Sequence, residues 1–177
     1  MQPRWRFIAE YSGFQIVWFS CAIGAARDSN VPGVVATFLF LMLALFARRW
    51  SHREIAIVLA SGLIGVIAET SLAATGMIRY GAAGGVLAPP WIIALWFAFG
   101  ATVSTTAQLL RGSTIIKSAA LGLVFGPLAY AAGERIGALI VTGATMQAYA
   151  VVALIWAIAL PALLSLQAVI NRPGTVT

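Results

Sequence analysis

The chain has 177 residues, of which 61% are hydrophobic and only 9% are charged, and its mean hydropathy is +0.95. Soluble domains carry roughly 25% charged residues, so this composition excludes an ordinary soluble domain and indicates a helical membrane protein. The net charge of +6 is no evidence for a nucleic-acid partner, because membrane proteins gather Lys and Arg in their cytoplasmic loops. A single cysteine, Cys21, excludes an internal disulfide.

Six apolar segments follow one another along the chain, separated by short polar or glycine-rich stretches. The first is interrupted by Glu10 and Gln15, which favours a retained membrane helix over a cleavable signal peptide. The predicted spans are residues 7–26, 31–47, 55–75, 90–110, 118–137 and 147–170. Each is long enough, at about 1.5 Å per residue, to cross or nearly cross a roughly 30 Å hydrocarbon core. We therefore expect residues 1–177 to form one all-α membrane domain, a polytopic bundle of six transmembrane helices.

The distribution of cations predicts the orientation of this bundle. With six spans, both termini lie on the same side of the membrane as the second and fourth loops. That side carries eight Lys and Arg residues, namely Arg4, Arg6, Arg48, Arg49, Arg53, Arg111, Lys117 and Arg172. The opposite side carries three, namely Arg27, Arg79 and Arg135. The positive-inside rule then predicts that both termini are cytoplasmic.

The third segment contains a carboxylate, Glu69, within the apolar sequence GVIAETSLAATG. The helical face that Glu69 shares is mostly Gly and Ala, and such faces are where membrane helices approach each other closely. We expect Glu69 to point into the bundle, in the outer leaflet. An acid at membrane depth costs roughly 2.5–3.5 kcal/mol on insertion scales for Asp at a helix centre, so Glu69 must be neutralised, paired or hydrated. It is either a ligand- or proton-binding group or a structural hydrogen-bonding group.

The fifth segment supplies the expected partner of Glu69, because Tyr130 lies on a second small-residue face at a similar depth. The other candidates for a shared polar pocket at the outer interface are Glu134, Arg135, Arg79, Tyr80 and Trp91. A structural interpretation also exists, since Tyr and Trp belong to interfacial belts and a Glu-Arg pair is typical of a helix end that meets water.

The inner half of the fourth segment carries a second polar zone, in which Thr102, Thr105 and Thr106 share one helical face and Ser104 and Gln108 lie on a neighbouring one. Hydroxyls at such positions commonly join helices or bond the carbonyl one turn earlier. Gln15 and Trp18 lie at the same depth on the first segment and are expected to face this zone.

Several chemistries are not expected. His52 is the only histidine, which excludes sites built from two or more histidines, and it lies in a predicted loop. The sequence GAAGG lacks the lysine of a phosphate-binding loop. We therefore expect no metal and no cofactor.

The sequences FQIVWF and GAA in the first segment, APPWIIALWFAFGAT and LLRG in the fourth, and GPLAYAAGERIGA in the fifth resemble a bacterial inner-membrane family catalogued as domain of unknown function 2878. The resemblance covers nearly the whole chain. It implies an inner-membrane location, an acid at the position of Glu69 (commonly aspartate) and a connection with lipids. It also implies an Asn-His-like pair where this chain has Ser104 and Thr105, which puts a histidine-based role there in doubt. Tryptophan-rich translocator-type proteins are similar in size, but their five spans fit the charge pattern less well.

Two classes of function remain. The first is a non-enzymatic membrane protein, either an accessory subunit or a binder or carrier of a lipid or small amphiphile, with a membrane-protein partner or a second copy as a further option. The second is a small intramembrane enzyme or proton-coupled transporter that uses Glu69 with Tyr130 and Glu134. The lack of a recognisable catalytic constellation favours the first class.

Overall fold

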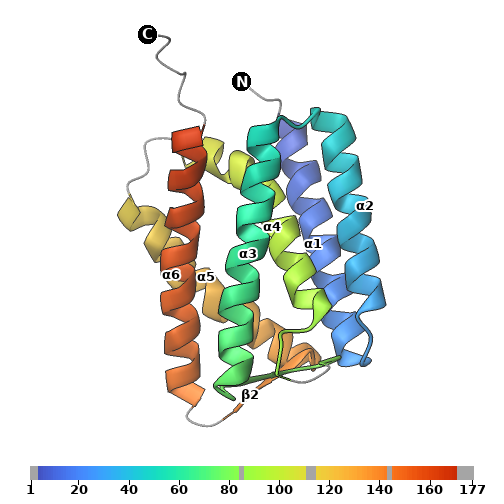
Figure 1. The fold of residues 1–177 in the computed structure, drawn as a ribbon, viewed down its shortest axis with the longest axis vertical. Helices are drawn as coiled ribbons and strands as arrows, with labels where there is room; N and C mark the ends of the chain where they lie inside the picture. Colours follow the sequence, from blue (N-terminus) through green and yellow to red (C-terminus); the bar gives the residue numbers. More distant parts are fainter. Residues whose placement is uncertain (1–3, 84–85, 111–114, 143–144, 171–177) are drawn as a thin grey trace.

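The computed structural model describes residues 4–83, 86–110, 115–142 and 145–170, and over these residues the chain is a bundle of helices that run alternately up and down (Figure 1). The six helices of this described part are α1 (Arg4–Ala26), α2 (Val31–Arg48), α3 (His52–Ala74), α4 (Pro90–Leu109), α5 (Ile115–Ile136) and α6 (Thr145–Ile170). Every predicted span is confirmed as a helix, with ends that differ by a few residues. Arg111 and Arg172, which entered the charge count, lie outside the described residues.

Within the described residues, the five helices α2 to α6 are long and apolar enough to cross a membrane. α1 is the exception, since arginines and the polar residues Glu10 and Gln15 lower its hydropathy. Large apolar side chains cover the outside of the bundle, as on α2, where Leu43 is 70% and Phe46 is 78% exposed. A soluble protein rarely exposes such a surface, whereas lipid covers it at no cost. The fold therefore indicates a multi-pass membrane protein.

Local sequence determines where several helices begin and end. α3 begins with a capping box, in which the Ser51 hydroxyl accepts from the Glu54 N–H at 3.4 Å and the Glu54 carboxylate accepts from the Ser51 N–H at 3.0 Å. α2 and α4 each have a proline in the first turn, where no N–H is needed. α5 is followed by Gly137, whose φ of +88° suits glycine.

Within the described residues, a short antiparallel ribbon is the one element that the sequence did not predict. Its strands, β1 (Ile78–Tyr80) and β2 (Leu139–Val141), join the segments that follow α3 and α5. The ribbon lies at the end of the bundle opposite the start of α1 and the end of α6 (Figure 1). Three-residue strands are too short to show a period of two in the sequence. Because Ile78 and Tyr80 are buried and Arg79 is exposed, the ribbon inserts the Tyr80 ring into the bundle.

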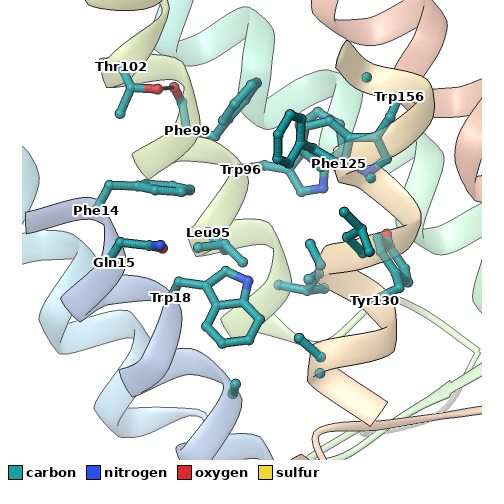
Figure 2. Close-up of a pocket in the computed structure, with 18 of the residues that line it drawn as sticks. Phe14, Gln15, Trp18, Leu95, Trp96, Phe99, Thr102, Phe125, Tyr130 and Trp156 are labelled. Carbon is teal, nitrogen blue, oxygen red and sulfur yellow. Dashed lines mark hydrogen bonds between the residues drawn. The ribbon is translucent and has the colours of Figure 1, made fainter. Parts of the chain in front are cut away.

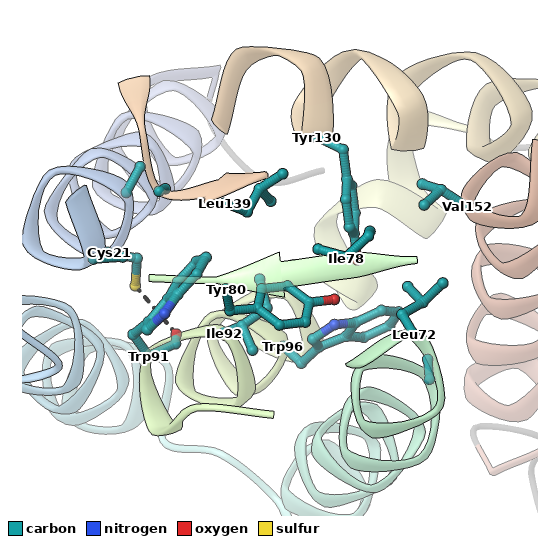
Figure 3. Close-up of a cluster of buried hydrophobic side chains, with 14 of the residues drawn as sticks. Cys21, Leu72, Ile78, Tyr80, Trp91, Ile92, Trp96, Tyr130, Leu139 and Val152 are labelled. Carbon is teal, nitrogen blue, oxygen red and sulfur yellow. Dashed lines mark hydrogen bonds between the residues drawn. The ribbon is translucent and has the colours of Figure 1, made fainter. Parts of the chain in front are cut away.

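The largest cluster of buried apolar side chains lies in the half of the bundle next to this ribbon (Figure 3). The face of α3 around Gly62 and Gly65 lies directly against α4, and a Cβ at either glycine would collide with the ring of Phe97 or Trp96. The expectation that the Gly-Ala face of α3 is a helix contact is therefore correct. This contact brings Glu69, on the same face, next to α4.

Candidate functional site

Glu69 is completely buried, and within the described residues its carboxylate accepts three hydrogen bonds. Oε1 accepts from the Trp96 indole nitrogen at 2.7 Å and from the Tyr130 hydroxyl at 2.5 Å. Oε2 accepts from the Tyr80 hydroxyl. Figure 3 shows the two phenols and the indole converging from α5, β1 and α4. We call these four residues the Glu69 cluster. The inward direction of Glu69 and its contact with Tyr130 were both expected from the sequence.

The donors of the Glu69 cluster are all neutral. An indole N–H can only donate. Burial, and after it the neighbouring Glu69 carboxyl, raises the pKa of the Tyr80 phenol, so this phenol keeps its proton. Both salt bridges in the described part of the chain involve Arg48, so no cation there pairs with Glu69. A buried carboxylate without partners is very costly, and three hydrogen bonds offset part of that cost while fixing four elements in place.

Glu134 does not join the Glu69 cluster. Its Oε1 accepts from the backbone N–H of Val141 at 2.9 Å, and its Oε2 accepts from the Tyr149 hydroxyl at 2.7 Å. Glu134 therefore ties the end of α5 to β2 and to the start of α6. A role for Glu134 in ligand or proton binding stays a prediction.

The remaining residues of the predicted outer pocket do not bond the Glu69 carboxylate, although Trp91 lines the same cavity as Glu69 and Tyr130. Trp91 is buried, but its indole nitrogen donates to the carbonyl of Gly81 at 2.8 Å. Arg79 on β1 and Arg135 near the end of α5 are exposed. Of the predicted set, the structure brings only Tyr80 and Tyr130 into contact with Glu69. The sequence analysis missed Trp96, which reads as one more aromatic residue of an apolar helix.

A cavity of about 780 Å³ lies beside the Glu69 cluster, between α1, α4, α5 and α6 (Figure 2). It extends from Tyr11 and Thr106, near the start of α1, to Gly133 and Leu139, beside the ribbon. Glu69, Trp96 and Tyr130 are among the residues that line it, but apolar side chains form most of the wall. These include Phe14, Trp18, Leu95, Phe99, Phe125 and Trp156.

Aromatic stacking explains one wall of this cavity. Gly122 and Gly126 of α5 leave room for Trp156 of α6, since a Cβ at either would collide with Trp156. Trp156 then stacks on Trp96 with ring centroids 4.6 Å apart and meets Phe99 edge-on at 5.1 Å. α5 packs chiefly on α6 and hardly touches α1, which leaves the space between α1 and α5 unfilled.

The cavity opens through the apolar side of the bundle. Four large apolar residues that line it, Phe19, Leu109, Phe125 and Leu128, are between 49% and 62% exposed. They belong to α1, α4 and α5, three of the helices around the cavity.

A family model with the description "Protein of unknown function (DUF2878)" matches residues 7–162 of the chain. The chain belongs to this family. The match includes all or most of each of the six helices of the described part, and therefore the Glu69 cluster and the cavity. It confirms the resemblance that the sequence motifs indicated. No curated protein and no solved structure matches the chain.

In this member of the DUF2878 family, some residues of the second predicted polar zone line the cavity and others do not. Gln15 and Trp18 line the cavity, whereas Ser104, Thr105 and Gln108 do not. The α4 hydroxyls that reach the cavity are Thr102 and Thr106, and Thr106 forms a 2.9 Å hydrogen bond with the Tyr11 hydroxyl. Helical phase explains the difference, because Thr102 and Thr106 are one turn apart on one face, whereas Thr105 is rotated by about 100° around the helix from Thr106.

Sequence reasoning also missed a charged cluster in this DUF2878 chain, formed by Arg48, Glu10 and Glu54. Arg48 donates to Glu10 at 3.0 Å, to Glu54 at 2.9 Å and to the carbonyl of Ala101 at 3.1 Å. One guanidinium thus joins α1, α2, α3 and α4. The available signal was Glu10 itself, an acid inside an apolar span at the depth of the arginines after the second span.

Proposed function

We propose that this chain is a non-enzymatic, multi-pass protein of the bacterial inner membrane whose cavity binds the apolar chain of a lipid or small amphiphile. The observation that carries the proposal is the cavity of about 780 Å³, with its aromatic walls and its opening on the apolar side of the bundle. Ligand pockets are typically of this size, largely apolar, and furnished with a few polar groups. A membrane supplies apolar chains at that opening.

The proposal includes a topology in which all six helices cross the membrane and both termini are cytoplasmic. The charge asymmetry supports it, with eight cations on one side and three on the other. Fusions of fluorescent protein or alkaline phosphatase to the C-terminus test it. We expect fluorescence and no phosphatase activity, and the reverse result would overturn the topology.

In this proposal Glu69 anchors the bundle and does not hold the ligand. The support is its complete burial and the number of donors that its carboxylate already accepts from. The alternative, a small intramembrane enzyme or proton-coupled transporter, draws support from the Glu69–Tyr130 hydrogen bond and stays a prediction. Transport lost in Glu69→Gln at normal abundance would favour the alternative.

The cavity itself provides a binding assay. Four of the six tryptophans of the chain line it, namely Trp18, Trp91, Trp96 and Trp156. A nitroxide quenches indole fluorescence on contact, so a doxyl-labelled methyl stearate is a suitable probe for the purified protein in detergent micelles. We expect quenching that saturates as the mole fraction of the probe in the micelle rises.

A matched pair of variants separates the cavity from the protein surface. Ala132 on α5 lines the cavity, and Ala120, on the same helix, does not. Ala132→Phe fills part of the cavity and is expected to weaken binding at least tenfold, while Ala120→Phe leaves it unchanged. Quenching that does not saturate, or that is equal in both variants, would overturn the proposal.

A further inference from the structure

One face of α1 carries polar groups into an otherwise apolar cavity. Tyr11, Gln15, Trp18 and Ala22 are spaced three or four residues apart and all line the cavity. Figure 2 shows the Gln15 amide and the Trp18 indole nitrogen directed into this space, and among the described residues neither side chain forms a hydrogen bond. Gln15 is also an exposed residue, and the surface that it exposes includes the cavity. An amide on a membrane helix without a protein partner needs another polar group beside it.

On the opposite wall, Trp156 offers a ligand its ring and not its indole nitrogen. The indole nitrogen of Trp156 is buried and has no hydrogen-bond partner among the described residues, although the Trp156 ring stacks on Trp96. An indole can only donate, and an amide both donates and accepts. The polar groups that α1 directs into the cavity, the Gln15 amide and the Trp18 indole, are therefore chiefly N–H donors, which an acceptor atom of a ligand would satisfy.

The charge of the lining restricts what that acceptor can be. No Lys, Arg or His lines the cavity within the described residues, and the one acidic lining residue, Glu69, is engaged by the Tyr80, Tyr130 and Trp96 donors. A carboxylate or phosphate inside the cavity would be an anion without a cation, which is costly in an apolar environment. A neutral oxygen carries no such cost.

From these observations we propose that the ligand is an amphiphile whose apolar chain carries a neutral acceptor oxygen, in an ester, ketone, ether or hydroxyl group, and that Gln15 and Trp18 bind this oxygen. The inference rests on the proposed function and deepens it, because it assigns the specificity of the cavity to two residues of α1. The inference predicts that the cavity binds apolar chains with a neutral oxygen more tightly than free fatty acids or plain hydrocarbons.

The test is competition against the doxyl-labelled methyl stearate bound to the purified full-length protein. The competitors are methyl palmitate, hexadecane and palmitate, which share a chain length and differ at one end. We expect methyl palmitate to displace the probe at a five- to tenfold lower mole fraction than hexadecane, the ratio typical of one net hydrogen bond, and palmitate to be the weaker of the two oxygenated competitors.

Variants of α1 connect this selectivity to named groups. Gln15→Met keeps the length of the side chain and removes its polar atoms, and Trp18→Phe keeps an aromatic ring and removes the N–H. Each is expected to bring methyl palmitate within about twofold of hexadecane while hexadecane itself still displaces the probe. Ser12→Ala is the control, because Ser12 is exposed on α1 and does not line the cavity, and it should retain the wild-type ratio.

The outcomes are distinguishable. Displacement by methyl palmitate and hexadecane at equal mole fractions, or the strongest displacement by palmitate, would overturn the acceptor assignment and leave the binding cavity intact. Selectivity that survives in both Gln15→Met and Trp18→Phe would also overturn it. Failure of every competitor to displace the probe would refute the proposed function and this inference together.

Discussion

Two polar clusters join the helices of this bundle, and they use opposite chemistry. Near the start of α1, Arg48 forms ion pairs with Glu10 and Glu54, whose side chains are 12% and 26% exposed. In the half next to the ribbon, Glu69 is completely buried and accepts only from neutral O–H and N–H groups. Each cluster connects four elements of the fold.

The difference follows from the access of water. A guanidinium that is still 14% exposed keeps part of its solvation, so two carboxylates can share it without a full desolvation penalty. At the depth of Glu69 a second charge would add its own cost of burial, whereas phenols and an indole bring polar hydrogens with no charge. The bundle thus uses ion pairs near its end and neutral donors in its interior.

Glu69→Leu is expected to cause the largest loss. It leaves three buried donors without an acceptor, and each costs roughly 1–3 kcal/mol before relaxation. We therefore expect the free energy of unfolding to fall by at least about 3 kcal/mol and the abundance in the membrane to be low. Glu69→Gln keeps one acceptor oxygen and should cost less than about 1.5 kcal/mol. Thermal unfolding of both variants in detergent measures this, and an unaffected Glu69→Leu would remove Glu69 from its anchoring role.

Arg48→Met tests the charged cluster. It leaves Glu10 and Glu54 without their cation, and we expect the free energy of unfolding to fall by about 2 kcal/mol. This is less than for Glu69→Leu, because water reaches Glu10 and Glu54. Arg53→Met is the matched control, since Arg53 is exposed and forms no salt bridge within the described residues. If the two variants unfold at the same temperature, the ion pairs contribute nothing to stability.

Gly65→Ala tests whether the close packing of α3 against α4 holds Trp96 in place in the Glu69 cluster. The added Cβ collides with the side chain of Trp96 and pushes the indole away from Glu69, so we expect a loss of about 1.5 kcal/mol. Gly133→Ala on α5 is the control, because its Cβ would meet only Leu139, at an ordinary 3.5 Å. Equal melting temperatures for the two variants would show that Trp96 can move freely, contrary to the account.

Tyr80→Phe should have the smallest effect within the buried cluster. It removes one of three hydrogen bonds to Glu69 and should cost about 1 kcal/mol. Tyr149→Phe, which removes a hydrogen bond to the partly buried Glu134, should cost less than about 0.5 kcal/mol, because water can replace the hydroxyl. The reverse order of the two losses would contradict the contrast between buried and partly exposed polar groups.

The sequence predicted the parts of this structure that depend on local pattern. Helix positions follow from hydropathy, and the contact between Glu69 and Tyr130 follows from two small-residue faces at one depth. The role of Trp96 was not predicted, because an indole N–H in an apolar helix gives no sign of its acceptor. Glu134 was expected at the same pocket, but the turn after α5 brings Tyr149 and Val141 closer to it.

Other features depend on how helices are arranged in space. Arg48 was interpreted only as a topology signal, because a span-end arginine does not reveal which distant acid it reaches. The cavity arises from four helices at once, and the stacking of Trp156 on Trp96 that forms its wall joins residues 60 positions apart. No spacing within a single helix encodes such a volume.

The most direct test of the account is the binding of the doxyl-labelled methyl stearate by Glu69→Gln. If the cavity holds the ligand and Glu69 only anchors the bundle, the variant should bind the probe within twofold of the wild type, with slightly lower thermal stability. Loss of probe binding in a Glu69→Gln protein of unchanged stability would contradict this account and make the carboxylate itself the ligand-binding group.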